Sequence, residues 1–241
     1  MSKVYADIQI PTNKPGLSHL NRKPYNWLFY DIINHDLESN CQKIRGVIYD
    51  LGCGEMPYKN WLLQHADRYV GVDWSATLHN LKADILADLN KPLPIKGQIA
   101  DTVVSLSVME HLKEPQNMLN EAFRILKPGG SMILQVPFMW WVHEAPYDYY
   151  RFTRHGLKYM FEKAGFTDVD VMPQTGFWVM WTLKFNYQSS RWIRGPWPIR
   201  KLMSALMLAI WEIDQRVAPW LDKHWSCEEE TAGYFVVARK P

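Results

Sequence analysis

The stretch Val47–Tyr58, VIYDLGCGEMPY, is an apolar run that ends in an acid and is followed at once by a glycine-rich loop. The run predicts a short buried strand. Gly52 and Gly54 allow the backbone to turn sharply and to come close to a ligand without a Cβ in the way. Ligands of parallel α/β sheets bind outside the carboxyl ends of the strands, so this loop is expected to hold a nucleotide cofactor.

The segments on both sides of this loop alternate between expected strands and expected helices. Strands are expected at 46–51, 68–73, 85–89, 100–108, 130–137, 167–173 and 230–240, and helices at 25–37, 58–66, 115–126 and 154–166. This alternation predicts an α/β fold with a parallel, doubly wound sheet that has helices on both faces.

The length of 241 residues suits a single domain. We divide it into an N-terminal arm and helix (1–40), a cofactor-binding core (45–172), a helical insertion (183–225) and a last strand (231–239). The first ~20 residues, with Pro11, Pro15 and Gly16, are expected to be irregular.

Composition narrows the functional classes. The net charge of +2 gives no general basis for binding nucleic acid. Three scattered cysteines form no disulfide framework or metal set, and no signal peptide or spanning segment is recognisable, so a cytoplasmic location is expected. Twelve tryptophans and eleven methionines, many of them after Val136, fill either the core or a surface that stacks on rings or sugars.

The glycine loop is poorly suited to NAD. It lacks the third glycine of the dinucleotide fingerprint, Pro57 removes an N–H donor, and Glu55 would repel a phosphate. A cofactor without phosphates, S-adenosylmethionine, fits better. Asp73, after the second strand, can accept hydrogen bonds from ribose hydroxyls, and Trp74 can stack on adenine.

Four segments together resemble the class I S-adenosylmethionine-dependent methyltransferases (type 11-like): VIYDLGCG, VGVDWS, ADLNKPLPIKGQIADTVVSLSVMEHL and EAFRILKPGGSMILQVP. The resemblance implies a Rossmann-like sheet of seven strands whose last strand is antiparallel. It implies an enzyme, and Asp88 as the adenine-binding acid. The residues expected to bind the cofactor are Asp50, Gly52, Cys53, Gly54, Asp73, Trp74, Asp88, Leu89 and Ser107.

The later segment HEAPYDYYRFT, with the PY after the glycine loop, resembles a methyltransferase subgroup associated with polysaccharide and cell-surface glycan biosynthesis. That implies a small-molecule or glycan hydroxyl as acceptor, in one variant a lipid-linked saccharide. The alternatives are a quinone, another aromatic metabolite or an amine, and, in another class, a non-catalytic binding module with the same fold.

A hydroxyl acceptor needs a general base, because its proton must leave during or before attack. His143 is the first candidate, His111 its rival, and Glu144 can orient the base or bind a hydroxyl. The residues expected to bind substrate are Tyr147, Asp148, Tyr150 and Arg151, although Asp148 and Arg151 can also form a structural ion pair. The spacing of His143, Glu144 and Asp148 matches no metal motif, so no metal is expected.

The insertion contains a helix that is apolar almost all round from Leu202 to Trp211, preceded by Arg191, Arg194, Arg200 and Lys201. Such a helix is normally buried, so a lid or a homodimer contact is expected. The alternative is peripheral membrane contact through 191–221, with arginines on anionic headgroups and tryptophans at the interface.

Overall fold

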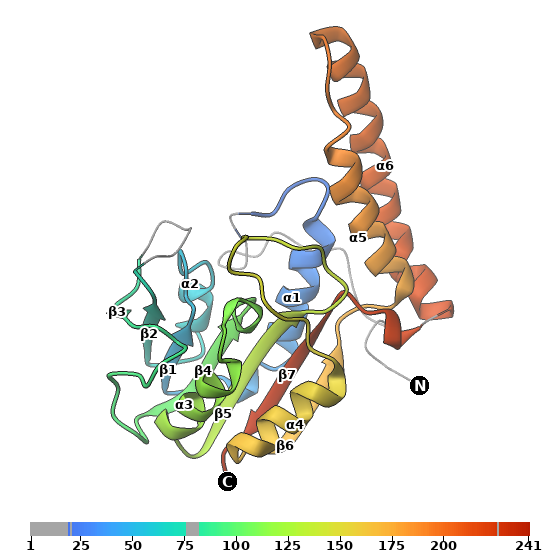
Figure 1. Cartoon of the computed structure of the whole chain (residues 1–241). Coiled ribbons are helices and arrows are strands. Elements are labelled where there is room, and N and C mark those ends of the chain that lie inside the picture. The colour runs from blue at the N-terminus through green and yellow to red at the C-terminus, as the bar shows by residue number, and fades with distance from the viewer. Residues whose placement is uncertain (1–18, 20, 76–81, 226) are drawn as a thin grey trace.

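The computed structural model describes residues 19, 21–75, 82–225 and 227–241 (Figure 1). Most of the expected irregular arm lies outside these residues. The strands are β1 (Val47–Leu51), β2 (Arg68–Asp73), β3 (Ile85–Leu86), β4 (Ala100–Leu106), β5 (Leu126–Pro137), β6 (Thr167–Pro173) and β7 (Gly233–Arg239). The helices are α1 (Trp27–Ser39), α2 (Lys59–Leu62), α3 (Pro115–Ile125), α4 (Arg154–Ala164), α5 (Phe177–Ser190) and α6 (Trp197–His224), with short 3-10 turns η1 (Cys41–Lys43), η2 (Met109–His111) and η3 (Glu228–Glu230).

The seven strands form one sheet in the order β3-β2-β1-β4-β5-β7-β6. β1 to β5 are parallel, and β7 runs antiparallel to both β5 and β6. The predicted doubly wound sheet with an antiparallel last strand is therefore confirmed. The order of the strands reverses between β1 and β4, which places a ligand crevice at the ends of these two strands.

Successive side chains of a strand point to opposite faces of the sheet, so the apolar ones pack against two layers of helices, one on each face. Tyr49 and Leu51 of β1 pack in the cluster that contains α3 and α4, whereas Ile48 packs in the cluster that contains α1 and α2. A buried parallel sheet needs such cover on both faces. Thr153 caps the start of α4, and Gly165, with a φ of 103°, ends it.

Several predicted boundaries differ from the structure. The strand expected at 85–89 has only two residues, and the strand expected at 100–108 ends at Leu106. The helix expected at 58–66 has only four residues, because a turn follows Leu62. The strand expected to begin at 130 begins at Leu126, where Ala100 of β4 pairs with it across an irregularity in the ladder.

α5 and α6 form a helical hairpin that projects away from the sheet (Figure 1). The insertion was expected to begin at 183, but α5 begins at Phe177, directly after β6. Asp222 of α6 accepts hydrogen bonds from the backbone N–H groups of Gly176 and Trp178, both at 2.8 Å, and so fixes this early start. Only the base of the hairpin packs on α1, through Leu28 and Leu183 among others.

The outer end of the hairpin, residues 191–210, is here called the hairpin tip. The apolar helix was expected to form a lid or a homodimer contact. Several of its side chains are exposed in the single chain, because the tip extends beyond the reach of α1, and the homodimer contact stays a prediction. Leu202 is 72% exposed and Trp197 is 64% exposed, while Met207 is the single buried residue among the described residues 191–210. No helix in the described part of the chain has the length and apolarity that a membrane crossing requires.

Candidate functional site

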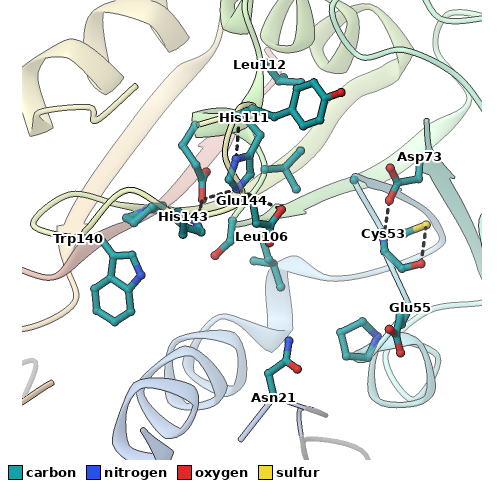
Figure 2. Close-up of a pocket in the computed structure, with 18 of the residues that line it drawn as sticks. Asn21, Cys53, Glu55, Asp73, Leu106, His111, Leu112, Trp140, His143 and Glu144 are labelled. Atoms are coloured by element: carbon teal, nitrogen blue, oxygen red, sulfur yellow. Dashed lines mark hydrogen bonds and ion pairs between the residues drawn. The ribbon is translucent and has the colours of Figure 1, made fainter. Parts of the chain in front are cut away.

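A cavity of about 900 Å³ opens at the carboxyl ends of β1, β2 and β4. All nine residues predicted to bind the cofactor line it, and so do the three predicted catalytic residues. Figure 2 shows Asp73 and Cys53 on one side of this pocket and His111, His143 and Glu144 on the other. The fold therefore brings the two predicted halves of the site into one cavity.

The glycine loop has the shape that a close approach requires. Gly52 has a φ of 83°, and a Cβ on it would lie 2.3 Å from Val108. Gly54 has a φ of 49°, and a Cβ on it would meet nothing within 4 Å. The loop is thus tightly packed on one side, while Gly54 leaves room for a ligand against the backbone.

Asp73, at the end of β2, holds this loop in place. One of its carboxylate oxygens accepts a hydrogen bond from the N–H of Gly54 and the other from the N–H of Trp74, both at 2.7 Å. Each carboxylate oxygen has a second acceptor position, so Asp73 can also receive both ribose hydroxyls. Trp74 lies against Tyr147, with ring centroids 5.1 Å apart and nearly perpendicular planes. These residues fit S-adenosylmethionine.

Asp88, Leu89 and Ser107 complete the cofactor half of the cavity. Burial raises the pKa of Asp88, but hydrogen bonds from Asn90 and Lys91 outweigh it and hold the pKa below the ordinary value, so the carboxylate is charged. Leu89 is buried. Ser107 has a φ of 55°, an uncommon value for a residue with a Cβ, and its hydroxyl donates to Gln135 at 2.6 Å.

Asp50 is buried at the end of β1, where its carboxylate accepts a hydrogen bond from the Tyr69 hydroxyl at 2.5 Å. Burial raises the pKa of Asp50 to about 7, the nearby charge of Asp73 adds to this effect, and the Tyr69 hydrogen bond opposes it. A cofactor ammonium group beside Asp50 would favour the ionised form.

This pKa predicts how cofactor affinity changes with pH. The ionised Asp50 attracts an ammonium group and the protonated one does not, so affinity is expected to rise through pH 7. Between pH 8 and pH 6 the Kd for S-adenosylhomocysteine, measured by calorimetry, is expected to increase about tenfold. In Asp50→Asn the Kd should be weak and nearly constant over this range; the same slope in the variant would show that another group is responsible.

The other half of the cavity contains four titratable side chains, here called the polar cluster: Glu110, His111, His143 and Glu144. The Nε2 atoms of His111 and His143 lie 3.7 and 3.9 Å from the same oxygen, Oε1 of Glu110. Glu144 also approaches His111, with Oε2 3.8 Å from the same Nε2 atom. Burial raises the pKa of Glu110 to about 8, and burial together with the neighbouring His111 lowers the pKa of His143.

Tyr147, one of the four predicted substrate-binding residues, lines the cavity, and Asp148, Tyr150 and Arg151 are not among its lining residues. Arg151 holds the buried Asp148 through two hydrogen bonds, of 2.6 and 2.8 Å, and the Tyr150 hydroxyl donates to the backbone of Lys113. Substrate binding by Asp148, Tyr150 and Arg151 stays a prediction. Asp148 and Arg151 form an ion pair in the structure. Asp148 also accepts a hydrogen bond from the N–H of His143, so the pair holds the loop that carries His143.

An aromatic wall closes the acceptor side of the cavity. It consists of Phe29, Tyr30, Trp140, Trp141 and Tyr187. Its rings stack on one another, with centroids 4.2 Å apart for Trp140 and Trp141, and 4.9 Å apart for Phe29 and Trp140. These residues were not among the predicted site residues, because they come from three segments that are distant in sequence: α1, α5 and the segment after β5. The enrichment in aromatic residues was the only signal for them.

The chain is similar to known methyltransferases. Residues 49–134 match the family model described as a methyltransferase domain. The chain is 30% identical over 129 residues to a probable S-adenosylmethionine-dependent methyltransferase of Mycolicibacterium smegmatis, a match that covers 51% of the chain and 48% of the relative. It is 26% identical over 99 residues to the ubiquinone biosynthesis O-methyltransferase of Pseudomonas aeruginosa, covering 36% of the chain and 42% of that protein.

The chain thus spans half or less of the length of these curated relatives. Among solved structures, the phosphoethanolamine N-methyltransferase 2 of Haemonchus contortus has a TM-score of 0.55 at 16% identity, over 90% of the chain and 57% of that protein. At such low identity the likeness concerns the fold alone. The expectation of a methyltransferase domain with S-adenosylmethionine as cofactor is confirmed.

Proposed function

We propose that this protein transfers the methyl group of S-adenosylmethionine to a hydroxyl of a small, ring-containing acceptor, in first place the sugar of a lipid-linked saccharide. The observation that carries the proposal is the polar cluster, which shares one cavity with the residues that fit the cofactor. When bound, the cofactor supplies a methyl group on a sulfonium; in-line attack by the acceptor oxygen breaks the carbon–sulfur bond and leaves S-adenosylhomocysteine. Much of the rate can come from holding the two partners in line.

The polar cluster provides atoms that can receive the hydroxyl proton. Nδ1 of His111 lies 2.9 Å from the carbonyl oxygen of Tyr147, which favours the tautomer with the proton on Nδ1. The lone pair of Nε2 then remains available inside the cavity. Nδ1 of His143 lies 3.3 Å from the carbonyl oxygen of Trp141 and 3.4 Å from the guanidinium of Arg151, so Nε2 of His143 is available when Nδ1 donates to Trp141. Either imidazole can thus act as the general base, with Glu144 beside it to bind a hydroxyl.

The aromatic wall supports an acceptor that contains a ring. Trp140 and Trp141 are partly exposed to the cavity, so their faces can lie against the apolar face of a sugar. The same faces also suit a phenol or a quinol, which is why a methyl acceptor of that class is the second candidate. A cavity of about 900 Å³ that holds the cofactor as well leaves room for a small group and not for a folded macromolecule.

The hairpin tip supports an acceptor anchored in a lipid bilayer. No Asp or Glu occurs from Val171 to Trp211, whereas Arg191, Arg194, Arg200 and Lys201 lie at or beside the turn between α5 and α6. These four cations are exposed, and so are apolar side chains among them such as Trp192 and Trp197. Basic and aromatic residues on one exposed end suit an anionic membrane surface.

Membrane contact predicts a specific result in vesicle co-sedimentation. The protein is expected to bind vesicles that contain anionic phosphatidylglycerol and to bind pure phosphatidylcholine vesicles at least about fivefold less. Trp197→Ser combined with Leu202→Ser should lower binding to the anionic vesicles about tenfold, because both side chains are exposed and leave water only at the interface.

The matched control is Tyr159→Ser, which removes an equally exposed ring from α4 and should leave vesicle binding unchanged. Sedimentation velocity without lipid distinguishes membrane contact from the alternative, a homodimer contact through the tip. A dimer that the tip variant dissociates, with no vesicle binding by the original chain, would identify the tip as a homodimer contact instead.

The function itself is tested with methyl-labelled S-adenosylmethionine, the protein, and membranes and extract from the source cells. Label is expected in a polar-lipid or glycan fraction, and it should be absent with Asp73→Ala. Label in apolar metabolites would support the phenolic acceptor. No label, combined with no binding of S-adenosylhomocysteine, would favour the non-catalytic binding module and contradict the proposal.

A further inference from the structure

We propose that Glu110, His111 and His143 bind a divalent transition-metal cation on the acceptor side of the cavity. Each of the three offers one ligand atom, and these atoms all lie within 4.8 Å of one another. Glu110 and His111 belong to η2, after β4, and His143 lies in the loop after β5, so the fold brings together residues 32 positions apart. No metal motif is visible in the sequence because the three ligands are not all close together along the chain.

Glu110 is the first argument for a cation. Its side chain is fully buried, and neither carboxylate oxygen has a hydrogen-bond partner among the described residues. A buried carboxyl group without partners is costly, and such groups in native proteins are normally satisfied by a hydrogen bond, a water molecule or an ion. Two imidazole Nε2 atoms face the same oxygen of Glu110, so a cation between them would satisfy all three groups at once.

The second argument is the orientation of the two imidazoles. Nδ1 of His111 is held by the Tyr147 carbonyl at 2.9 Å, and Nδ1 of His143 lies 3.3 Å from a carboxylate oxygen of Asp148. Asp148 is in turn fixed by Arg151. Metal-binding histidines typically donate their other N–H to a carbonyl or a carboxylate, which presents Nε2 to the metal. This gives Asp148 and Arg151 a role as positioning residues.

The distances suit a first-row cation. Zinc binds nitrogen and oxygen ligands at about 2.0–2.2 Å, so neighbouring ligand atoms lie roughly 3.0–3.5 Å apart. The distances of 3.7 and 3.9 Å from Glu110 Oε1 to the two Nε2 atoms require only a small contraction. Two imidazoles and one carboxylate favour zinc, cobalt or iron over magnesium or calcium, which prefer oxygen ligands. In Figure 2, Glu144 lies next to His111 and His143.

Three protein ligands leave at least one coordination position open, as in catalytic metal sites. This step rests on the proposed function: we place the acceptor hydroxyl at the open position, where a cation would lower the pKa of the hydroxyl. The imidazole lone pairs are then occupied by the metal and cannot take the proton. Glu144, 3.8 Å from His111 and partly exposed, is the residue that would receive it and pass it to solvent.

The test is metal binding by the whole protein, stripped with EDTA and then titrated with Zn²⁺ by calorimetry and with Co²⁺ by visible absorption. We expect one Co²⁺ per chain, with an absorption band typical of imidazole ligands, and no comparable binding of Mg²⁺. Glu110→Gln and His143→Ala should each weaken binding at least about thirtyfold. His155→Ala, which removes an exposed histidine of α4, is the matched control and should change the Kd less than twofold.

Folding and cofactor binding are measured in the same samples, by circular dichroism and by titration with S-adenosylhomocysteine. Equal metal affinity in all variants, or a Kd of the original chain weaker than ~100 µM, would overturn the metal site. Methyl transfer that continues undiminished in EDTA would do so as well, while leaving the proposed function intact. Stoichiometric metal binding without methyl transfer to any fraction would instead uphold the site and contradict the proposed function.

Discussion

Asp73→Ala is expected to weaken binding of S-adenosylhomocysteine at least about hundredfold, or roughly 2.7 kcal/mol. Two losses add together. The carboxylate no longer accepts the ribose hydroxyls, and the N–H groups of Gly54 and Trp74, which it now holds at 2.7 Å, lose their partner. Because the variant loses the support of the loop as well as a ligand contact, the affinity should fall more than one lost ligand contact would suggest.

Calorimetry with two further variants makes this prediction specific. Asp73→Asn keeps the shape and one acceptor oxygen, so its Kd should lie between those of the original chain and Asp73→Ala. Asp170→Ala removes an acid from β6, whose residues do not line the cavity, and should leave the Kd unchanged. A Kd for Asp73→Ala within threefold of the original, in a folded protein, would show that Asp73 does not bind the cofactor.

The sequence alone permitted a good prediction of the sheet but not of its strand order. Buried strands such as Val47–Leu51 and Ala100–Leu106 are short apolar runs, and local periodicity identifies them. Periodicity contains no information on which strands are neighbours. The resemblance to a family implied that the last strand is antiparallel and lies beside the sixth. The structure confirms this and places β7 between β5 and β6.

The two halves of the site differed in how well they could be predicted. The cofactor residues lie directly after strands and within a few positions of recognisable motifs. Because the strands are parallel, their carboxyl ends lie at the same edge of the sheet, so these residues come together there. The acceptor half depends on burial and on distant segments. The unpartnered carboxyl of Glu110 and the contact of Trp140 with Phe29 exist only once α1 and the loop after β5 are packed together.

The hairpin shows a related limit. An apolar helix in the sequence indicates that its side chains avoid water, but it does not indicate which part of the protein, or which partner, covers them. Leu202 was expected in a lid or a homodimer contact and is largely exposed in the single chain, as is the neighbouring Trp197, because the hairpin is far longer than the surface of α1 that supports it. The contact that fixes the hairpin is polar and joins residues more than forty positions apart, which no local pattern indicates.

Asp222→Ala is therefore expected to destabilise the protein more than any other single substitution of a polar residue in the hairpin. Its carboxylate is fully buried and accepts from the N–H groups of Gly176, Trp178 and Val179 at 2.8, 2.8 and 3.3 Å. It also places a negative charge at the N-terminus of α5. Three donors without a partner, two of them buried, should lower the free energy of unfolding by roughly 2–4 kcal/mol. Calorimetry should show a decrease in Tm of about 5–12 °C.

Two further variants separate capping from a general effect of charge on α6. Asp222→Asn retains one acceptor oxygen and should lose about half as much stability. Glu212→Ala breaks only an exposed ion pair with Arg216 and should change stability by less than about 0.5 kcal/mol. In Asp222→Ala, amide hydrogen exchange at Trp178 and Val179 should become faster than in α1, because the start of α5 opens first. Unchanged exchange there, with a Tm within 2 °C of the original, would mean that the apolar contacts of the hairpin base hold α5 in place without Asp222.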